Sequence, residues 1–585
     1  MKSIRLIKGQ TMRLKKPEDF SNKVFWSTGF LRYDGNFLKN AGYYKIKREL
    51  RVGEAEGERR AEAAKADHLL KIDEISNQDV CITAENKGNV VVSVKDDTGK
   101  ERKWRLEILH ENPNHLPDVS KDDFRKIRLK WKQLLTGQGL NATEEGRELL
   151  NEIHRDAENV WNKYFYKGQK ICEGIPWKEN QKEQENKDIP YIDDAIKFTS
   201  AFQNVLVLCK AYGAEGGLFY KNQELLQDII NILDFLCNKC YVPKTQTDNW
   251  WTWEIGIPKE LIPSLMIIFD SLTKEQIWKY TEGIAFFQLD PFHEGGIGTA
   301  STHGQGYRKG QGANIIDCST IAVGLGALRE DNELVYLGML ASAETFVIKN
   351  VEESSKISNK GYESGFYSDG SYLDHVKVPY LGAYGIEFMK GAAKIPYLLY
   401  ETPWKYPTSI WKNLESYIMD GFGNAIYKGC MLDCLKGRSV SRPTWSNRDI
   451  GREAMKIIIR LLDFLGENSK ETVFAMLKEW VEADKGFLDS LKNVEDINIK
   501  HKAQKLLRNT SIVSYTAPVH KSYPLMDRVI HRRKKYLFAV SMYSERIQNT
   551  EIMNHENRFG WHQNNGMTYI YDDDNQYTEN YWNTV

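Results

Sequence analysis

Helical segments with apolar residues at regular spacing follow one another along most of this sequence, and they constrain the fold more than any other feature. The first, DDFRKIRLKWKQLLTG, begins at Asp122 with acidic residues, as helices often do. Similar segments recur between short Gly- or Pro-containing breaks: IDDAIKFTSAFQNVLVLCKAYG, ELLQDIINILDFLCNK, PKELIPSLMIIFDSL, CSTIAVGLGALREDNELVYLGMLASAETF, TSIWKNLESYIMDGFGNAIY, REAMKIIIRLLDFLG and TVFAMLKEWVEADKGFLDSL. A series of antiparallel helix pairs predicts an α-solenoid or a toroid, and the lack of a strict repeat favours the closed toroid.

Strand-like sequence flanks the helical region. At residues 79–109, DVCITAENKGNVVVSVKDDTGKERKWRLEIL alternates apolar and polar residues between turn signals, as hairpins do, and a charged, helix-prone run at 54–67 precedes it. Strand signals return near Ser511 in SIVSYTAPVHK, YLFAVSMYS, GMTYIYDDDNQY and ENYWNTV. The sequence therefore predicts an α+β multidomain chain.

We expect a small β-rich accessory domain at residues 1–118, a helical (α/α) toroid at 119–508 and an antiparallel β-sandwich that starts at 509 and continues to 585. Carbohydrate binding and a passive spacer are both open as roles of the first domain. Because strand signals continue to the last residues, we expect the sequence to stop inside the β-domain.

Composition narrows the class of protein. Of the 585 residues, 41% are hydrophobic and 12% aromatic, which is typical of a globular chain. The 80 Lys and Arg residues balance 80 Asp and Glu residues, so gross charge argues against a nucleic-acid-binding protein. Affinity for a polyanion would have to come from a local basic cleft.

The cysteine pattern does not indicate a metal site, and the apolar runs do not indicate a membrane-spanning segment. Cys237 and Cys240 form a single CxxC at the end of an apolar helical stretch, without a second pair or a histidine cluster, so we expect packing thiols. No apolar run reaches membrane-spanning length. Residues 1–20 lack an apolar core, so no export signal is visible.

The segment DGSYLDHVKVPYLGAYG at residues 369–385 contains the strongest candidate chemistry. His375 and Tyr384 are nine residues apart, so one regular element would place them on opposite faces. Pro379 disfavours helix at the preceding residue, which predicts a turn between the two rings. The following IEFMKGAAKIPYLLY is typical of a buried helix and places Tyr384 at its N-terminus, where partial positive charge favours a phenolate.

By itself a His–Tyr pair of this kind is more often structural than catalytic. However, DGSYLDHVKVPYLGAYG resembles the catalytic His–Tyr segment of polysaccharide lyase family 8, which contains the hyaluronate, chondroitin AC and xanthan lyases. Two further segments are similar to that family. NWWTWEIGIP (249–258) resembles its tryptophan-rich motif, which implies that Trp250 and Trp251 seat a sugar, and GQGANIIDCS (310–319) resembles its catalytic asparagine segment, with Asn314 in the key position.

Two more segments complete the resemblance, which runs from about residue 122 to the end. GRSVSR at 437–442 contains Arg438 and Arg442, four residues apart, so a helical turn would let both guanidinium groups face one cleft. Residue spacing alone would equally fit a salt-bridged surface pair. Residues 526–562 resemble the start of the family's central β-domain, with Glu551 and Asn554 where cleft residues lie. The family continues past this point, so the sequence is either a fragment or lacks β-domains supplied elsewhere.

The resemblance implies a carbon–oxygen lyase that cleaves an acidic, uronate-containing polysaccharide, hyaluronan or chondroitin, by β-elimination. It implies that Asn314 and His375 bind the uronate carboxylate, that Tyr384 transfers the protons with Arg438 and Glu551 beside it, and that Arg442 and Asn554 bind substrate. We expect no cofactor or metal, an acidic polysaccharide as the partner, a monomer, and an extracellular location, with a cytoplasmic one as the alternative.

Other functions stay open at this stage. Xanthan is an alternative substrate within the same family. A glycoside hydrolase on a helical toroid would need paired carboxylates, for which Glu254, Glu294 and Asp369 are candidates. A non-catalytic carbohydrate-binding protein would use the same aromatic cleft without cutting.

Overall fold

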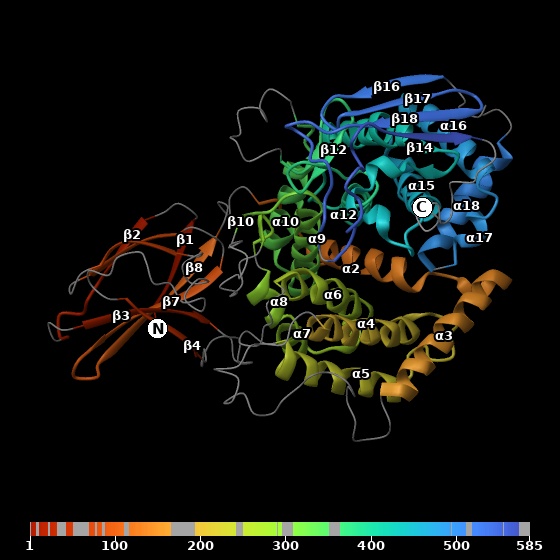
Figure 1. The fold of residues 1–585 in the computed structure, drawn as a ribbon. Coiled ribbons are helices and arrows are strands. Elements are labelled where there is room, and N and C mark those ends of the chain that lie inside the picture. The colour runs from red at the N-terminus through yellow and green to blue at the C-terminus, as the bar shows by residue number, and fades with distance from the viewer. Residues whose placement is uncertain are drawn as a thin grey trace. The chain divides into compact units, whose positions relative to one another are not determined.

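The structure is a computed structural model of the chain. It describes residues 2–7, 11–20, 24–31, 43–50, 70–75, 79–84, 88–109, 116–164, 193–241, 250–288, 290–294, 308–349, 363–492, 494–509, 518–553 and 555–572 (Figure 1). The chain divides into two compact units, each of which is described by itself. The first comprises Met1–Gly310, Cys318–Gly338 and Thr402–Trp404, and the second comprises Gln311–Asp317, Met339–Glu401 and Lys405–Val585.

The N-terminal part of the first unit consists of strands. Its described strands are β1 (Lys2–Ile7), β2 (Thr11–Lys15), β3 (Val24–Leu31), β4 (Tyr43–Leu50), β5 (Leu70–Ile75), β6 (Asp79–Ala84), β7 (Gly88–Asp96) and β8 (Glu101–Leu109). They form a five-stranded sheet in the order β1-β8-β7-β3-β4, in which only the β1–β8 pair is parallel, and a three-stranded sheet in the order β2-β6-β5. The β-rich character expected before the helices is confirmed, whereas the charged run at 54–67 lies outside the described residues.

One of the two expected hairpins is present. Strands β7 and β8 pair through a turn in which the Asp96 carboxylate accepts hydrogen bonds from the backbone of Thr98 (3.0 Å) and Lys100 (2.9 Å), with Gly99 at φ +94°. The expected β6–β7 hairpin is wrong, because both edges of β6 are taken by β2 and β5 and β7 belongs to the other sheet. Alternating residues predicted the strands but not their partners.

Helices form most of the rest of the first unit, which also contains an antiparallel pair of short strands, β9 (His293–Glu294) and β10 (Arg308–Lys309). The helices lying wholly within it are α2 (Lys121–Thr136), α3 (Glu144–Tyr164), α4 (Asp193–Gly213), α5 (Gln223–Phe235), α6 (Ile257–Ile268), α7 (Lys274–Tyr280) and α8 (Glu282–Phe287), while α9 (Gly312–Arg329) and α10 (Asn332–Thr345) contain residues of both units. The expected start of α2 is confirmed by a capping box, in which Ser120 and Asp123 satisfy each other's backbone N–H groups. Helix α3 was not predicted.

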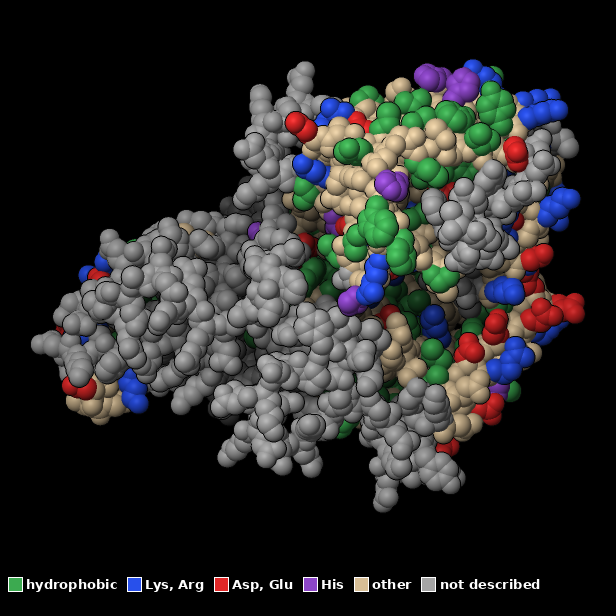
Figure 2. Space-filling view, in the orientation of Figure 1, with side chains coloured by type: hydrophobic (Ala, Val, Ile, Leu, Met, Phe, Trp, Pro, Cys, Tyr) green, Lys and Arg blue, Asp and Glu red, His purple; other side chains and the backbone are tan. Residues whose placement is uncertain are grey.

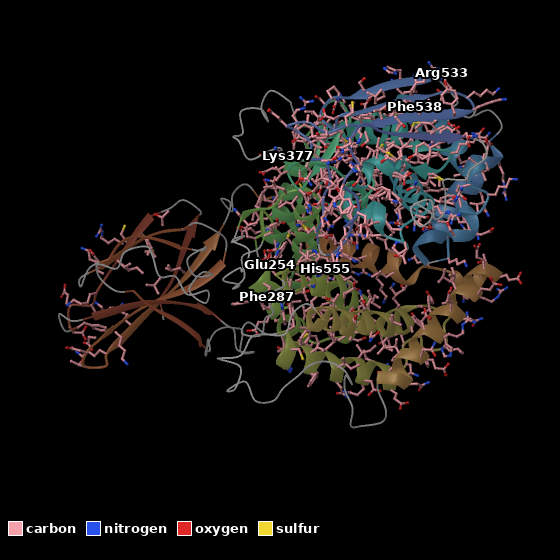
Figure 3. All side chains as sticks on the ribbon, viewed as in Figure 1. Glu254, Phe287, Lys377, Arg533, Phe538 and His555 are labelled. Carbon is pink, nitrogen blue, oxygen red and sulfur yellow. The ribbon has the colours of Figure 1, made fainter. Side chains whose placement is uncertain are left out.

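The tryptophan-rich segment forms part of this unit's core. Trp253 is fully buried in a π-helical turn, Thr252–Gly256, and stacks on Tyr241 with 5.8 Å between ring centroids and 11° between planes. Phe287, labelled in Figure 3, lies 5.4 Å from the same indole. Cys237 and Cys240 are also buried, which confirms that they pack in the core.

The second unit surrounds a small sheet with helices. The sheet has the order β11-β12-β13, from β11 (Gly365–Phe366), β12 (Tyr372–Asp374) and β13 (Val378–Pro379), and a two-stranded pair consists of β14 (Ile426–Tyr427) and β15 (Cys430–Met431). The helices are α12 (Tyr384–Leu399), α13 (Thr408–Ser416), α14 (Gly423–Ala425), α15 (Asn447–Leu461), α16 (Glu467–Ala483), α17 (Phe487–Ser490) and α18 (Val494–Arg508). Helix α15 packs on α12 and starts with a Ser446–Asp449 capping box.

A four-stranded antiparallel sheet ends the described chain, drawn in blue in Figure 1. It consists of β16 (Val519–Tyr523), β17 (Arg528–Arg532), β18 (Tyr536–Ser541) and β19 (Met567–Asp572) in sequential order. Strand β17 was not predicted, because its sequence RVIHR looks too polar for a half-buried strand. Arg528 is nevertheless buried, since its guanidinium donates to the carbonyls of Cys434 (3.0 Å) and Met542 (2.9 Å) and to the Asn564 side chain (2.6 Å).

Within the described ranges, no helix combines the length and the apolar character needed to cross a bilayer.

Candidate active site

A tight turn between β12 and β13 holds His375. His375 and Val376 adopt left-handed backbone angles, φ +45° and +73°, which are unfavourable for residues with a side chain. The buried Asp374 carboxylate stabilises this turn: Oδ1 accepts from the His375 N–H at 2.8 Å and from Ser364 Oγ at 3.0 Å, and Oδ2 accepts from the Tyr372 hydroxyl at 3.1 Å. The hydrogen bonds of Asp374 therefore hold the strained backbone at His375 in place.

Tyr384 is the first residue of α12, as the sequence predicts. Its ring centroid lies 4.7 Å from that of His375, with 52° between the planes. The turn at His375 and the helix start at Tyr384 thus bring together two rings that are nine residues apart in sequence.

Arg438 joins this pair to the rest of the site. It lies in a 3-10 segment, Gly437–Ser441, and its side chain is 5% exposed. Nη2 donates to the Tyr384 hydroxyl at 3.3 Å, and Nη1 donates to the Tyr380 hydroxyl at 2.8 Å. Gly437, at φ +54°, makes this approach possible, because a Cβ there would lie 2.1 Å from the Tyr380 ring.

Glu551 closes the cluster from a distant part of the chain. One carboxylate oxygen, Oε1, lies 2.5 Å from His375 Nδ1, and the other, Oε2, accepts from Arg438 Nη1 at 3.0 Å. The Tyr380 hydroxyl also donates to Oε2. Glu551 is 6% exposed and therefore contacts three polar side chains in a desolvated setting.

A second carboxylate, Glu556, binds both arginines of GRSVSR. Its Oε2 accepts from Arg438 Nε at 2.7 Å and from Arg442 Nη2 at 3.0 Å, and its Oε1 accepts from Arg442 Nε at 2.6 Å. The expectation that two arginines four residues apart converge is confirmed, because both contact one carboxylate. They differ in exposure: the side chain of Arg442 is 41% exposed and that of Arg438 is buried.

Burial and charge set the protonation states. Burial raises the pKa of Tyr384, and the charge and hydrogen bond of Arg438 only partly oppose that shift. The phenol is therefore protonated near neutral pH, although Arg438 acts in the expected direction. For Glu551, burial would raise the pKa, but the hydrogen bond and charge of His375 help to hold it below its usual range, with Tyr380 and Arg438 contributing. The site thus combines an ionised carboxylate with a protonated phenol.

Asn314 lies at the start of α9, next to the hairpin. Gly312, at φ +57°, approaches Asp374 so closely that a Cβ would lie 2.5 Å from its Oδ2. Gln311 Oε1 accepts from the Ser364 N–H at 3.1 Å. Asn314 itself is half-buried, and none of the hydrogen bonds made by Tyr384, His375 or Arg438 reaches it.

The two predicted sugar-seating tryptophans belong to the first unit. Trp250 is half-buried and Trp251 is 39% exposed, and the Trp251 ring packs on Gly256, where a Cβ would lie 2.8 Å away. Trp253, two residues after Trp251, is fully buried and fills the core position of the motif. Asn554 lies outside the described residues.

Two residues of the cluster, Tyr380 and Glu556, were not predicted from the sequence. Tyr380 lies inside the quoted segment DGSYLDHVKVPYLGAYG, so its position among three tyrosines was an available signal. Glu556 follows Glu551 by five residues in a polar stretch and looks like an ordinary surface acid. Only the tertiary contacts with Arg438 and Arg442 distinguish it.

The three candidate carboxylates for a glycoside hydrolase, Asp369, Glu254 and Glu294, do not belong to the cluster around Tyr384. Asp369 stabilises a turn, because it accepts from the Ser371 N–H at 2.9 Å, the Ser371 hydroxyl at 2.8 Å and the Leu525 N–H at 3.2 Å. Glu254 and Glu294 are buried in the first unit. Within the residues that the structure describes, no three His, Cys, Asp or Glu side chains are grouped as metal ligands.

The chain matches two family models. The model described as "Polysaccharide lyase family 8, N terminal alpha-helical domain" matches residues 131–479, and "Polysaccharide lyase family 8, super-sandwich domain" matches residues 518–585. The hyaluronate lyase HylB of Enterococcus faecalis is 28% identical over 487 residues, which cover 80% of this chain and 45% of that protein. A hyaluronate lyase of Staphylococcus aureus is 33% identical over 346 residues, 58% of this chain and 41% of that protein.

A solved structure shows the same fold. The chondroitin AC lyase of Streptomyces coelicolor A3, in complex with chondroitin sulphate, superposes with a TM-score of 0.66 at 23% identity over 79% of this chain and 59% of that one. The fold class, a helical α/α toroid with an antiparallel β-domain, is thereby confirmed. The chain spans about half the length of the curated relatives it matches. Since the helical family model alone covers more than half of the residues, the chain belongs to polysaccharide lyase family 8.

Proposed function

We propose that this protein is a polysaccharide lyase that cuts an acidic polysaccharide at a uronate by β-elimination. One observation carries the proposal: the Arg438 guanidinium binds both the Tyr384 hydroxyl and the Glu551 carboxylate, which in turn holds the His375 imidazole. A proton-transfer group, a cation and an oriented imidazole are thus fixed around one point. The relatives are named hyaluronate and xanthan lyases, which supports hyaluronan as the substrate and xanthan as the alternative, while chondroitin rests on the family resemblance.

The elimination needs help because a uronate already carries a negative charge when its C5 proton leaves. Donors placed at the carboxylate stabilise the enolate-like charge that develops there. Asn314 supplies an amide N–H for this purpose. His375 Nδ1 is engaged by Glu551, so Nε2 is the ring nitrogen left for substrate, and in the protonated ring Nε2–H donates to the uronate carboxylate.

Tyr384 carries both proton transfers in this proposal. Its phenolate accepts the C5 proton, and the resulting phenol returns a proton to the leaving glycosidic oxygen. Ionising a tyrosine with an ordinary pKa near 10 costs about 4 kcal/mol at pH 7, and burial adds to that cost here. The hydrogen bond from Arg438 offsets part of it. The protonated resting state suits the second step, protonation of the leaving group.

The remaining roles follow the exposure of each side chain. Arg442 is exposed enough for its planar fork to meet an acidic group of the substrate once Glu556 releases it. Trp251 offers an exposed ring for a sugar. Secretion and a monomeric state are part of the proposal on the family resemblance alone.

A substrate panel tests the proposal. The full chain is incubated in turn with hyaluronan, chondroitin sulfate and xanthan, and the ultraviolet absorbance of the unsaturated uronate is followed. New reducing ends without absorbance would indicate hydrolysis instead. Saturable binding without shortening of the polymer would indicate a carbohydrate-binding protein.

The variant Tyr384→Phe is the specific control for the proposed acid and base. It removes one hydroxyl and keeps the ring that packs against His375, so the polymer should still bind. General acid–base groups contribute about 10²- to 10⁴-fold, and both proton transfers are lost here, so turnover should fall by at least about 10²-fold. More than about a tenth of the wild-type rate would exclude this role for Tyr384.

A further inference from the structure

The loop that supplies Glu551 and Glu556 also displays two aromatic side chains to solvent. Phe559 is 85% exposed and Trp561 is 55% exposed, and their ring centroids lie 5.8 Å apart at 77°. Figure 2 shows hydrophobic side chains at the surface of the described chain. Exposed aromatic groups in contact with each other, unlike single surface hydrophobic residues, mark interaction sites.

The backbone under these rings is fixed. Asn557, 8% exposed, donates through Nδ2 to the Glu551 carbonyl at 3.0 Å and to Gln563 Oε1 at 2.9 Å, while its N–H donates to Ser441 Oγ at 3.0 Å. Gly560 lies so close that a Cβ would be 2.4 Å from Asn557 Oδ1. The two rings are therefore held on an anchored turn, so a ligand would not have to order this backbone on binding.

A cation directly precedes the two rings in sequence. Arg558 Nη2 donates to His555 Nδ1 at 2.7 Å, and both side chains are exposed; His555 is labelled in Figure 3. Neither side chain is hydrogen-bonded to Arg438, Arg442, Glu551 or Glu556. The loop thus combines an apolar aromatic surface with a positive charge, and the candidate active site begins at its other end, at Glu551.

We infer that Phe559, Trp561 and Arg558 form a further sugar subsite, which binds a ring of the same acidic polysaccharide outside the unit being cut. The apolar face of a pyranose would lie on the aromatic rings, and its carboxylate or sulfate would meet Arg558. The identity of the ligand rests on the proposed function. The same loop carries Glu551 of the candidate active site, so a polysaccharide bound there could extend to these rings.

The test is binding of the full chain to defined polymers, measured by retardation in native gels containing hyaluronan or chondroitin sulfate, with dextran as the neutral control. The double variant Phe559→Ala/Trp561→Ala should bind both acidic polymers at least about fivefold more weakly with an unchanged melting temperature. Arg558→Gln should weaken the same binding and reduce its dependence on salt. The matched control is Tyr536→Ala, which removes a 42%-exposed ring on β18 and should leave both the retardation and the melting temperature unchanged.

Each contrary result has a defined meaning. Unchanged retardation of the double variant would overturn the subsite. A fall of several degrees in its melting temperature, or a change from dimer to monomer, would also overturn it, because the rings would then be covered by protein. If the wild type binds and the double variant does not, while no unsaturated product forms, the subsite stands and the proposed lyase activity fails. If product forms and binding is insensitive to the variants, only the subsite fails.

Discussion

Arg438 uses all three guanidinium nitrogens within the site. Nε binds Glu556, Nη1 binds Tyr380 and Glu551, and Nη2 binds Tyr384. A lysine could keep the charge and one of these contacts, but not the planar arrangement. Arg438 therefore has two separable effects, the orientation of four side chains and the electrostatic support of the Tyr384 phenolate.

The electrostatic effect predicts a shift in the pH–rate profile. In Arg438→Ala the nearby positive charge is lost, the phenolate is disfavoured and the pKa of Tyr384 rises further. The rising limb of the profile should therefore move to higher pH, together with a strong fall in rate, while Arg438→Lys should shift the limb less. The measurement is initial rate of unsaturated product against pH. A limb that stays in place would restrict Arg438 to binding substrate.

Removing the charge of Glu556 should move the rising limb of the pH–rate profile in the opposite direction. Glu556→Gln removes a negative charge that neutralises Arg438, but keeps an oxygen that can accept from Arg438 Nε. The uncompensated cation favours the Tyr384 phenolate, so the rising limb should move to lower pH. Glu556→Ala loses the acceptor as well, so its rate should fall with Arg438 no longer oriented. Movement of the limb to higher pH in Glu556→Gln would contradict the proposed arrangement.

Much of the site could be predicted from local sequence. The convergence of His375 and Tyr384 followed from Pro379 and from the helix after Gly385, and the structure confirms it. Tyr380 could not be assigned because its hydroxyl contacts Glu551 only through tertiary packing. The roles of the residues remain predictions, since geometry places side chains but does not measure their reactions.

At the scale of elements, the π-helical turn before α6 sets which tryptophan is structural. Trp253→Ala should lower the free energy of unfolding by about 3–5 kcal/mol, because it removes a fully buried ring stacked on Tyr241. Trp251→Ala should cost less than about 2 kcal/mol, because its ring is 39% exposed. Chemical denaturation of both variants checks the difference. Equal losses would mean that Trp251 also belongs to the core.

Helix α16 contains a carboxyl whose ionisation opposes folding. Burial raises the pKa of Glu479 from 4.5 to about 7, although Arg532 and Lys428 act to lower it, and its buried Oε2 has no hydrogen-bond partner among the described residues. The folded state holds this proton more tightly than the unfolded state. The stabilising contribution is therefore complete below pH 4.5 and is lost as the pH rises to about 7.

Glu479→Gln should remove this dependence. At pH 8 the variant should be more stable than the wild type by about 1–3 kcal/mol, since the Glu479 carboxylate must take up a proton or be buried ionised on folding, and Gln requires neither. At pH 4 the two should be equally stable. Urea unfolding at both pH values provides the comparison. A wild type whose stability rises between pH 5 and 7, with no difference from Glu479→Gln, would show that Arg532 keeps the carboxylate ionised.

Elements with strong local signals were predicted, and those determined by long-range pairing were not. The acidic start and apolar spacing of α2 and the apolar sequence of α12 identified both helices. Strand β17 was hidden by two buried arginines. Carbonyl and amide acceptors from other segments satisfy the Arg528 guanidinium, and Arg532 Nη1 donates to the Gly423 carbonyl. The pairing of β6 depended on which strands reach its edges, which no local pattern encodes.

At the scale of the whole molecule, the family assignment covers most of the chain, while the chain spans about half of each curated relative. The residues that surround Tyr384 nevertheless lie within the second unit, whereas Trp250 and Trp251 belong to the first. The division into segments 1–118, 119–508 and 509–585 remains a prediction. Strands give way to helices between Leu109 and Lys121 and return after Arg508, which is compatible with that division.

The bond between His375 and Glu551 spans 176 residues, and that between Arg438 and Glu551 spans 113. Loops of this length close late in folding, because their entropy is lost before the contact forms. Helices can therefore be complete in a chain that still has no oriented imidazole, and catalytic competence arrives with the last step of assembly. Under the proposed function this order is a safeguard, because an immature copy has helical content without the arrangement of His375, Arg438 and Glu551 that elimination requires.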